Sequence, residues 1–421
     1  MTTPLISSHT PVRQPALIQP ALTQPVLIVG GGLVGASLAI ALDAAGCDAI
    51  LVEAAAPRVD TQPSYDERNL ALARATVNGL DAIGVWRHAA AQATPIKHIH
   101  ISRAGDFGSA RMDAEREGVD ALGWTLPARE LGVALLRRLD ECTRLRRLAP
   151  AKLEALEPLA DGWRAQIRTA EGLQSIDAAL VVGADGTASY VREQLGIEAE
   201  VHDYQQTLFV CTVTPERAHA NRAYERFADN GPVALLPLTE RRCGLVLTVP
   251  SEEADAVVKL DDAGFIAFAQ QRFGWRLGRL GRPGKRHPYA IKRVAAQRLI
   301  GPRAVLVGNA AQTVHPIGAQ GFNLGLRDAL TLAELVADAD DPGAADLLER
   351  YAARRVPDRE GTMTMSHGLV QLACLPQPLL GPLRSLALLA CDRVPPLQRL
   401  LARRGMGFRG ESPRAVLERL P

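Results

Sequence analysis

Three glycine-rich segments carry the residues whose types and spacing could do chemistry, and the first is Gly30-Gly-Gly-Leu-Val-Gly35. It follows a short apolar run typical of a buried strand and precedes an apolar stretch typical of a helix. At such a turn Gly30 allows the tight bend, Gly32 lets backbone N–H groups approach a pyrophosphate, and Gly35 lets the helix pack closely on the strand. Glu53 ends a second apolar run about 20 residues later, where a carboxylate accepts hydrogen bonds from an adenosine ribose. The segment therefore predicts a dinucleotide site at the positive end of a helix.

The same glycine pattern occurs again in Gly405-Met-Gly-Phe-Arg-Gly410, but in a different context. This segment follows Arg403 and Arg404 instead of an apolar strand. This pattern binds a dinucleotide only at a strand-to-helix turn, so we expect no dinucleotide site at residues 405–410.

The second segment, Gly183-Ala-Asp-Gly-Thr-Ala-Ser189, directly follows a run typical of a strand. A loop at this place can bring Asp185 and backbone amides close to phosphate or ribose groups. A plain Asp-Gly turn capped by Ser189 is an equally good interpretation, since this residue pair is common in turns.

The third segment, Gly308-Asn-Ala-Ala-Gln-Thr-Val-His-Pro316, ends another apolar strand and continues as a long turn into a helix. Backbone N–H groups at a helix start lack partners and favour negative charge, such as that of a reduced flavin ring. His315 is a candidate base in this turn. A helix-entry residue with a positioning role is the alternative, because a base needs a defined partner and geometry.

With Glu53 and Arg192, the three segments resemble the group A FAD-dependent aromatic monooxygenases related to p-hydroxybenzoate hydroxylase. The stretch 308–328 is very similar to one branch, the 2-octaprenyl-6-methoxyphenol hydroxylases of ubiquinone biosynthesis. So are Tyr65-Asp-Glu-Arg-Asn-Leu-Ala-Leu72 and Leu126-Pro-Ala-Arg-Glu-Leu131. The resemblance covers roughly residues 25 to 365 and implies FAD as cofactor, NAD(P)H as electron donor and O2 as co-substrate.

The family's site residues carry over to matching positions of this chain. The resemblance implies that the ADP half of FAD is held by Gly30, Gly32, Gly35 and Glu53. It also implies that Arg68 and Arg129 contact the cofactor, with Asp185 and Gly186 near its pyrophosphate. The ribityl chain and flavin ring are expected against Gly308, Asn309, Pro316, Gly318, Gln320, Gly321 and Asn323. Within this loop His315 and Pro316 are the catalytic candidates, and no residue is assigned as a general base.

Two positions depart from the family pattern. Asn309 stands where the wider family usually has Asp, and its amide can still hydrogen-bond the ribityl chain. The common Ala-Gly-Gln-Gly of the flavin loop is Gly318-Ala-Gln-Gly321 here, which moves one glycine.

The elements expected around these segments indicate an α/β fold. A Rossmann-like FAD-binding domain is interleaved with a mainly antiparallel β-sheet substrate domain, and a helical C-terminal region follows. Apolar runs at 208–213, 232–237 and 243–249 are expected strands of the sheet, while 70–83, 127–139 and the residues from Arg327 onward have helical periods. The expected parts are a flexible N-terminal tail (1–24), the FAD-binding domain (25–95, 119–203 and 290–345), the sheet domain (96–118 and 204–289) and the helical region (346–421).

Length and composition are those of an ordinary globular protein of two or three domains, with 421 residues, 47% of them hydrophobic and 22% charged. The net charge of +2, without Lys/Arg runs interleaved with aromatics, gives no reason to expect nucleic acid. Six scattered cysteines lack metal-ligand spacing and predict reduced thiols in a cytoplasmic protein without a metal site. The first 24 residues lack the apolar core of a secretion signal.

The reaction that the resemblance implies is hydroxylation of a phenol ring that carries a polyprenyl chain. NAD(P)H would reduce the FAD, and O2 would then form a C4a-hydroperoxide whose distal oxygen attacks the ring. The protein would orient the ring and exclude water. We expect the ring pocket in the sheet domain, with ordinary core packing as the alternative for each of its candidates, Tyr224, Phe227, Leu236 and Pro237.

The C-terminal region combines an uncharged stretch with an excess of basic residues. No Asp, Glu, Lys or Arg occurs from Thr362 to Leu383, and eight arginines against three acidic residues follow from Arg384 onward. Three prolines interrupt the stretch, which disfavours a membrane span and favours a peripheral hairpin on the inner face of the cytoplasmic membrane. Contacts with the catalytic core, with a second copy of the chain or with other ubiquinone-biosynthesis enzymes are the alternatives.

Two rival functions share the cofactor residues, namely a flavin reductase or oxidase of related fold and a non-catalytic subunit of a quinone-biosynthesis complex. A flavin-dependent halogenase is disfavoured, because its Trp-x-Trp-x-Ile-Pro motif cannot be formed by the widely spaced Trp86, Trp124, Trp163 and Trp275. Stimulation of NAD(P)H oxidation by a phenol would distinguish the monooxygenase from both rivals.

Overall fold

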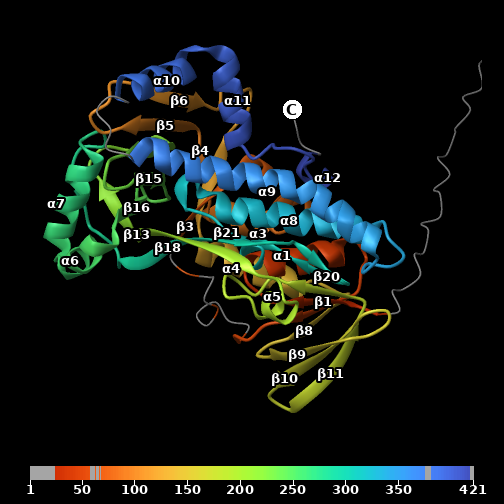
Figure 1. The fold of residues 1–421 in the computed structure, drawn as a ribbon. Coiled ribbons are helices and arrows are strands. Elements are labelled where there is room, and N and C mark those ends of the chain that lie inside the picture. The colour runs from red at the N-terminus through yellow and green to blue at the C-terminus, as the bar shows by residue number, and fades with distance from the viewer. Residues whose placement is uncertain (1–23, 57–61, 63–65, 67, 375–380, 418–421) are drawn as a thin grey trace, which may run out of the picture.

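The computed structural model describes residues 24–56, 62, 66, 68–374 and 381–417 (Figure 1). The predicted N-terminal tail lies outside these residues, apart from Gln24.

A six-stranded sheet forms the first core, in the order β19-β20-β12-β1-β2-β8. Every residue of its central strands is buried: β1 (Val26–Val29), β2 (Ala49–Val52) and β12 (Leu180–Gly183). Such continuous apolar runs are typical of parallel strands that are covered on both faces. The sheet is completed by the parallel strands β8 (Leu145–Leu148) and β20 (Ala304–Leu306) and the antiparallel edge strand β19 (Ile300–Gly301).

Helices pack on this sheet and on one another. α1 (Leu33–Ala44) follows β1 and packs against α4 (Ala128–Asp140) and α8 (Gln320–Ala337). The long helix α9 (Ala345–Cys374) packs along α8 (Figure 1). A helical stretch is predicted from Arg327 onward, but α8 already begins at Gln320. The residues that follow the third glycine segment therefore belong to the helix.

A nine-stranded sheet forms the second core, in the order β21-β18-β13-β16-β15-β14-β5-β6, with β17 paired to β13. All its pairs are antiparallel except β14 with β5. On one face α6 (Ala254–Lys259) and α7 (Asp262–Phe273) contribute to the core. The strands are β5 (His98–Arg103), β6 (Ser109–Asp113), β13 (Ala199–Pro215), β14 (Arg222–Phe227), β15 (Val233–Pro237), β16 (Cys243–Pro250), β17 (Leu280–Gly281), β18 (His287–Ala296) and β21 (Gln312–Thr313).

The predicted fold class is confirmed, since a parallel sheet, an interleaved and mainly antiparallel sheet and a helical C-terminal region are all present. The second sheet extends beyond the predicted 204–289, because β13 begins at Ala199 and β18 ends at Ala296. These two strands pair over most of their length, which continues the sheet towards the first core.

Two small antiparallel sheets and several short helices complete the fold. One sheet is β3 (Asn69–Ala73), β7 (Gly123–Pro127) and β4 (Thr94–Ile96), and the other is β9 (Lys152–Pro158), β10 (Trp163–Thr169) and β11 (Gly172–Ala178). The remaining helices include α2 (Arg74–Ala82), α3 (Trp86–Ala89), α5 (Tyr190–Gln194), α10 (Gly381–Arg393), α11 (Pro395–Gly405) and α12 (Arg414–Leu417).

The helix predicted over 70–83 is wrong in its first part. That part is β3, whose backbone pairs with β7, and the helix α2 begins only at Arg74. Pairing between distant segments here overrides a local helical period.

The C-terminal region packs on the rest of the fold through α10 and α12. Asp392 of α10 binds Arg111 of β6 with two hydrogen bonds to the guanidinium, of 3.1 and 2.9 Å. α12 packs against α2. The five cysteines whose side chains the structure describes, Cys47, Cys142, Cys211, Cys243 and Cys391, are unpaired. Among the described residues no group of three or more His, Cys, Asp or Glu is arranged as a metal site.

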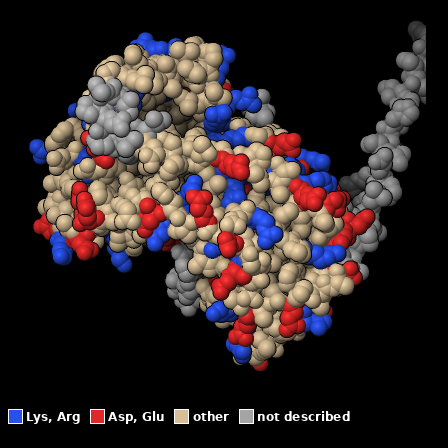
Figure 2. All heavy atoms as spheres, viewed as in Figure 1, with Lys and Arg blue, Asp and Glu red and all other residues tan. Residues whose placement is uncertain are grey.

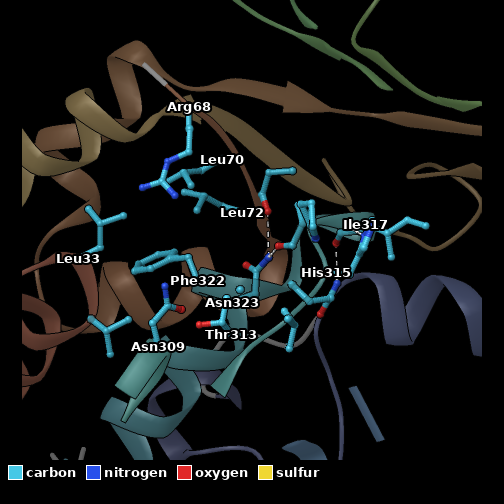
Figure 3. A pocket seen from close by; sticks show the side chains of 18 of the residues that line it. Leu33, Arg68, Leu70, Leu72, Asn309, Thr313, His315, Ile317, Phe322 and Asn323 are labelled. Atoms are coloured by element: carbon cyan, nitrogen blue, oxygen red, sulfur yellow. Dashed lines mark hydrogen bonds between the residues drawn. The ribbon is translucent and has the colours of Figure 1, made fainter. Parts of the chain in front are cut away.

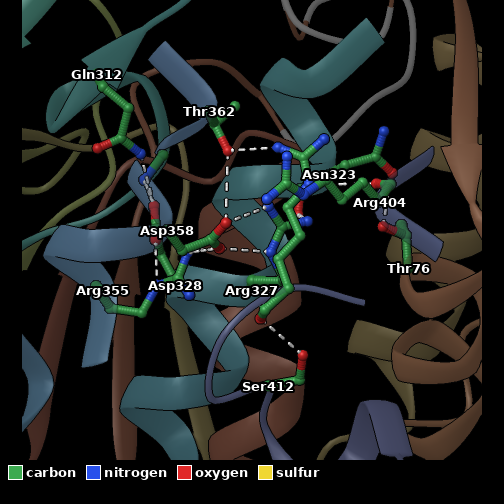
Figure 4. A network of polar contacts seen from close by, with 12 residues as sticks. Thr76, Gln312, Asn323, Arg327, Asp328, Arg355, Asp358, Thr362, Arg404 and Ser412 are labelled. Carbon is green, nitrogen blue, oxygen red and sulfur yellow. Dashed lines mark hydrogen bonds and ion pairs between the residues drawn. The ribbon is translucent and has the colours of Figure 1, made fainter. Parts of the chain in front are cut away.

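A buried network of charges joins α8 to α9 (Figure 4). Asp358 accepts hydrogen bonds from Arg327 Nε at 2.7 Å and from Arg355 Nη2 at 2.8 Å, and Asp328 accepts one from Arg355 Nε at 2.8 Å. All four side chains are almost completely buried. Asp328 also accepts hydrogen bonds from Gly308 N and Gln312 Nε2, so the network holds the third glycine segment in place.

Substituting Asp358→Asn should lower the free energy of unfolding by about 3–5 kcal/mol, because it leaves two buried guanidinium groups short of a negative charge. Burial raises the pKa of Asp358, but Arg327 and Arg355 outweigh it and hold the pKa below its ordinary value of 3.8. The difference in the free energy of unfolding between the variant and wild type should therefore persist at pH 4 and above. It should shrink at lower pH, as Asp358 becomes protonated in the wild type. Urea unfolding of both proteins measures it.

The matched control is Asp346→Asn on the same helix, where the side chain is 78% exposed. That change should cost less than about 0.5 kcal/mol. Equal losses in the two variants would contradict the role given to the network.

Candidate active site

One cavity of about 1010 Å³ reaches from the three glycine segments to the nine-stranded sheet. Figure 3 shows its cofactor end, where Arg68, Leu33, Phe322 and Asn309 surround a hollow. The predicted residues that line the cavity are Gly30, Gly32, Glu53, Arg68, Asp185, Gly186, Asn309, His315, Pro316, Gly318, Gln320, Gly321 and Asn323.

The first glycine segment has the geometry of a dinucleotide turn. Gly30 has a φ of +105°, and a Cβ there would lie 2.5 Å from the Ala184 carbonyl oxygen. A Cβ on Gly35 would lie 1.9 Å from the Gly30 carbonyl oxygen, so both positions need glycine. Gly32 caps α1 without a side-chain hydrogen bond to the first N–H groups. These amides can therefore donate to an anion at the positive end of the helix.

Glu53 lies beside this turn at the end of β2. Its Oε2 accepts a hydrogen bond from Gly31 N at 2.5 Å, and its Oε1 accepts one from Ala55 N at 2.7 Å. A carboxylate offers about four acceptor sites, so the ribose hydroxyls can still bind here.

The second glycine segment fits both interpretations of its sequence. Ser189 caps α5 by accepting a hydrogen bond from Arg192 N, as the turn interpretation predicts. Asp185 accepts hydrogen bonds from Ser189 Oγ at 2.5 Å and Val191 N at 3.0 Å. Asp185 and Gly186 nevertheless form part of the cavity wall. Arg192 donates to the Ala310 carbonyl oxygen at 2.9 Å and so ties this segment to the third one.

The flavin loop contains two consecutive residues with positive φ, Gly318 at +66° and Ala319 at +50°. A left-handed conformation costs a residue other than glycine about 1–2 kcal/mol, so Ala319 carries strain that the moved glycine would have avoided. Ala319 has no side-chain hydrogen bond to the first N–H groups of α8, which therefore remain available to an anion. The Asn309 side chain is exposed and faces the cavity in Figure 3.

His315 is held in one orientation by both ring nitrogens. Nδ1 accepts a hydrogen bond from Ile317 N at 3.1 Å, which leaves Nε2 to donate to Gln206 Oε1 at 3.1 Å. Burial, with a smaller contribution from His367, lowers the pKa of His315 to about 4. A neutral ring with both nitrogens engaged matches the helix-entry interpretation better than a base.

Asn323 is engaged with the protein on both sides of its amide (Figure 3). Its Oδ1 accepts hydrogen bonds from Ala73 N and Thr76 Oγ1, and its Nδ2 donates to the carbonyl oxygens of Ala71 and Ala319. Its side chain therefore joins the flavin loop to β3 and α2.

The two predicted arginines differ in position. Arg68 lines the cavity, with Nε 2.9 Å from Asp66 Oδ1 and its guanidinium over the ring of Tyr289. Arg129 is half-exposed, pairs with Glu130 at 3.2 Å and is not part of the described cavity wall. Gly35 and Gly308 lie behind the wall, where they allow close packing on Gly30 and Val34.

Of the four predicted substrate residues, Phe227 and Leu236 line the cavity, but Tyr224 and Pro237 do not. Tyr224 lies in the core on the other face of the sheet, with its ring 5.6 Å from that of Phe273. Successive residues of a strand face opposite sides, so residues 224 and 227 cannot share a face, and neither can 236 and 237. Tyr224 therefore packs in the core, as the alternative interpretation of its sequence has it, while Pro237 is buried away from the described cavity wall.

Several cavity residues escaped the sequence prediction. Lys152 and Tyr190 line the cofactor end, Glu225 lies on the sheet, and Arg404 and Arg409 approach from the C-terminal segment. Strand alternation with Phe227 could have indicated Glu225. Arg404 lies near the end of α11, so the glycine pattern of residues 405–410 begins at the end of a helix and not after a strand.

Substituting Gly35→Ala should weaken FAD binding about tenfold or more, because a Cβ there forces α1 away from Gly30 at a cost of about 1–3 kcal/mol. The FAD content of the purified protein and its affinity for added FAD measure the effect. Gly361→Ala in α9 is the control, since nothing lies within 4 Å of the added carbon. Full FAD content in the Gly35 variant would refute the proposed dinucleotide site at Gly30–Gly35.

The comparisons with known proteins agree with this geometry. The FAD binding domain family matches residues 23–366. Ubiquinone hydroxylase UbiL of Rhodospirillum rubrum is 37% identical, over 88% of this chain and 86% of its own length. The 3-demethoxyubiquinol 3-hydroxylase of Escherichia coli is 30% identical, over 88% of this chain and 95% of its own length.

Among solved structures, p-nitrophenol 4-monooxygenase PnpA from Pseudomonas putida DLL-E4 has a TM-score of 0.76 at 19% identity and covers 93% of this chain and 100% of its own. That likeness shows the fold. The cavity extends from the dinucleotide turn at Gly30–Gly35 to the nine-stranded sheet. The two sequence relatives match 88% of this chain. The chain therefore belongs to the FAD-binding monooxygenases and, within them, to the family of the ubiquinone hydroxylases.

Proposed function

We propose that this protein hydroxylates the ring of a polyprenylated phenol of the 2-polyprenyl-6-methoxyphenol type in ubiquinone biosynthesis, using NAD(P)H and O2. The observation that carries this proposal is a continuous cavity that connects the dinucleotide turn at Gly30–Gly35 to an apolar sheet face. The names of the two relatives, a ubiquinone hydroxylase and a 3-demethoxyubiquinol 3-hydroxylase, support a substrate of this class.

The chain's own residues bind and orient the cofactor. The turn at Gly30–Gly35 and Glu53 would hold the ADP half, and the loop of residues 316–321 would face the flavin ring. When bound, FAD would supply hydride acceptance from NAD(P)H and the activation of O2. Free amides at the start of α8 would stabilise negative charge on the reduced ring.

The substrate end of the cavity would orient the phenol ring and exclude water. Its wall is apolar over most of its area, which favours a lipophilic ring and disfavours loss of the activated oxygen to water. The apolar residues include Ile99, Ile101, Met112, Leu208, Val210, Ala223, Phe227, Ala234, Leu236 and Val246.

The test is the fate of isotope-labelled O2. Purified holoprotein should oxidise NADH or NADPH faster with a short-chain 2-prenyl-6-methoxyphenol and place one labelled oxygen atom on its ring. Oxidation of NAD(P)H without labelled product for several phenols would favour the reductase or oxidase. Bound FAD that NAD(P)H does not reduce would favour the non-catalytic subunit.

The surface of α10 and α11 supports a peripheral contact with lipid. The large apolar side chains exposed there are Leu383, Leu386, Leu389, Val394, Leu397 and Leu400. Figure 2 shows this part of the surface as largely uncharged, with basic residues at its edges. Leu401 and Arg404 of α11 also line the cavity, so a polyprenyl chain held in a bilayer would lie next to its substrate end. None of the described helices is both long and apolar enough to span a membrane.

The double substitution Leu386→Ser and Leu397→Ser should weaken binding to anionic phospholipid vesicles about tenfold, because it removes apolar area from the contact. Cosedimentation with vesicles measures the effect. Leu173→Ser is the control, since that side chain is 53% exposed and lies on β11, outside α10 and α11. Equal binding by all three proteins would refute the lipid contact, and a second copy of the chain would then be the expected partner.

A further inference from the structure

We propose that Glu225 binds the phenol hydroxyl of the substrate and takes its proton when the ring is attacked. This inference rests on the proposed function and adds a residue that touches the reacting ring. It comes from the position of Glu225 on the sheet wall of the cavity, where its carboxylate lies among apolar side chains.

Glu225 belongs to β14, which lies between β5 and β15. It pairs with Ile101 on β5 and with Ala234 on β15, and both neighbours line the cavity. Ala223 and Phe227, two residues away on either side, also line it, as strand alternation requires. The side chain of Glu225 is therefore enclosed by protein but faces the cavity.

Of the residues that the structure describes, three carboxylates line the cavity, and Glu225 differs from the other two. Glu53 and Asp185 each accept hydrogen bonds from backbone N–H groups. Among the described residues, none donates a hydrogen bond to the Glu225 carboxylate or forms an ion pair with it. An unpaired carboxylate in an apolar wall is costly, so its position indicates a ligand that supplies the missing donor.

Burial raises the pKa of Glu225 from its ordinary value of 4.5 to about 7. The residues that face Glu225 from the neighbouring strands are apolar. The ring of His100 on β5 instead contacts the ring of Tyr224, which lies in the core on the far side of the sheet. Arg404 and Arg409 line the cavity from the C-terminal segment, where Arg409 donates to Thr362 Oγ1 at 3.0 Å. At neutral pH a substantial fraction of Glu225 is thus ionised and able to accept a proton.

The proposed step conserves atoms, protons and electrons. The phenol O–H bond breaks, its proton passes to a Glu225 oxygen, and its electron pair stays on the phenol oxygen and activates the ring. The ring carbon forms a C–O bond to one atom derived from O2, the other atom leaves as water, and the hydride of NAD(P)H supplies the electrons. The attacked carbon then loses its hydrogen as a proton, and Glu225 returns its own proton to the phenol oxygen.

The first measurement tests the state of Glu225 without turnover. Its raised pKa means that the folded protein holds a proton which the unfolded chain releases, so stability is full below pH 4.5 and falls as the pH rises towards and through about 7. The holoprotein with Glu225→Gln should therefore match wild type at pH 5 more closely than at pH 8, where it should have the higher melting temperature. Glu200→Gln on β13, an exposed acid, should show no such trend. A pH-independent difference between Glu225→Gln and wild type would overturn the burial argument.

The second measurement tests the contact with the phenol. Oxidised holoprotein without NAD(P)H is titrated with 2-methoxyphenol and with 1,2-dimethoxybenzene, which lacks the hydroxyl, and binding is followed by flavin absorbance. Wild type should prefer the phenol about tenfold at pH 8, and the preference should shrink below pH 7. Glu225→Gln should lose both the preference and its pH dependence, whereas Glu225→Asp should keep the pH dependence.

Equal preference in wild type and Glu225→Gln would overturn the proposal. Neither measurement requires product to form, so failure of the proposed function leaves both readouts intact. Conversely, if Glu225→Gln incorporates labelled oxygen as efficiently as wild type, the role of Glu225 fails while the proposed function stands.

Discussion

The buried charges between α8 and α9 are the constraint on which the active site depends. Asp328 and Asp358 neutralise Arg327 and Arg355 in a region closed to water, and each carboxylate has several donors. Such a network is stable only when all its members are present, because each remaining partner would otherwise be a buried charge. The network therefore defines a single arrangement of the two helices.

That arrangement is transmitted to the cavity by direct hydrogen bonds. Asp328 fixes Gly308 N, and Arg327 donates to the Asn323 carbonyl oxygen at 3.1 Å. Asn323 in turn binds Ala71 on β3 and Ala319 in the flavin loop. The strained φ of Ala319 persists because these contacts hold the loop from both ends. Segments far apart in the sequence thus line one cavity. Its backbone amides can bind the cofactor, and its sheet wall can contact an apolar ring.

The sequence predicted those features that local chemistry determines. A glycine turn between an apolar strand and a helix needs the same backbone wherever it occurs, so Gly30, Gly32 and Glu53 were expected where they lie. Features that depend on distant pairing were missed. The helical period of 70–83 gives no sign of the strand β3 in its first part. Local sequence also leaves both cavity and core open for Tyr224, which packs in the core while its neighbour Glu225 faces the cavity. The engagement of His315 and Asn323 by Gln206, Thr76 and Ala71 could not be inferred from spacing, because those partners come from other elements.

The most direct test is a crystal structure of the holoprotein with 2-methoxyphenol bound. We expect the ADP half of FAD at Gly30–Gly35 and Glu53, the flavin ring against 316–321, and the phenol ring between the flavin and the sheet wall near Phe227 and Leu236. A phenol bound on another face of the sheet, or FAD bound without contact to the glycine turn, would contradict the view that one cavity serves both.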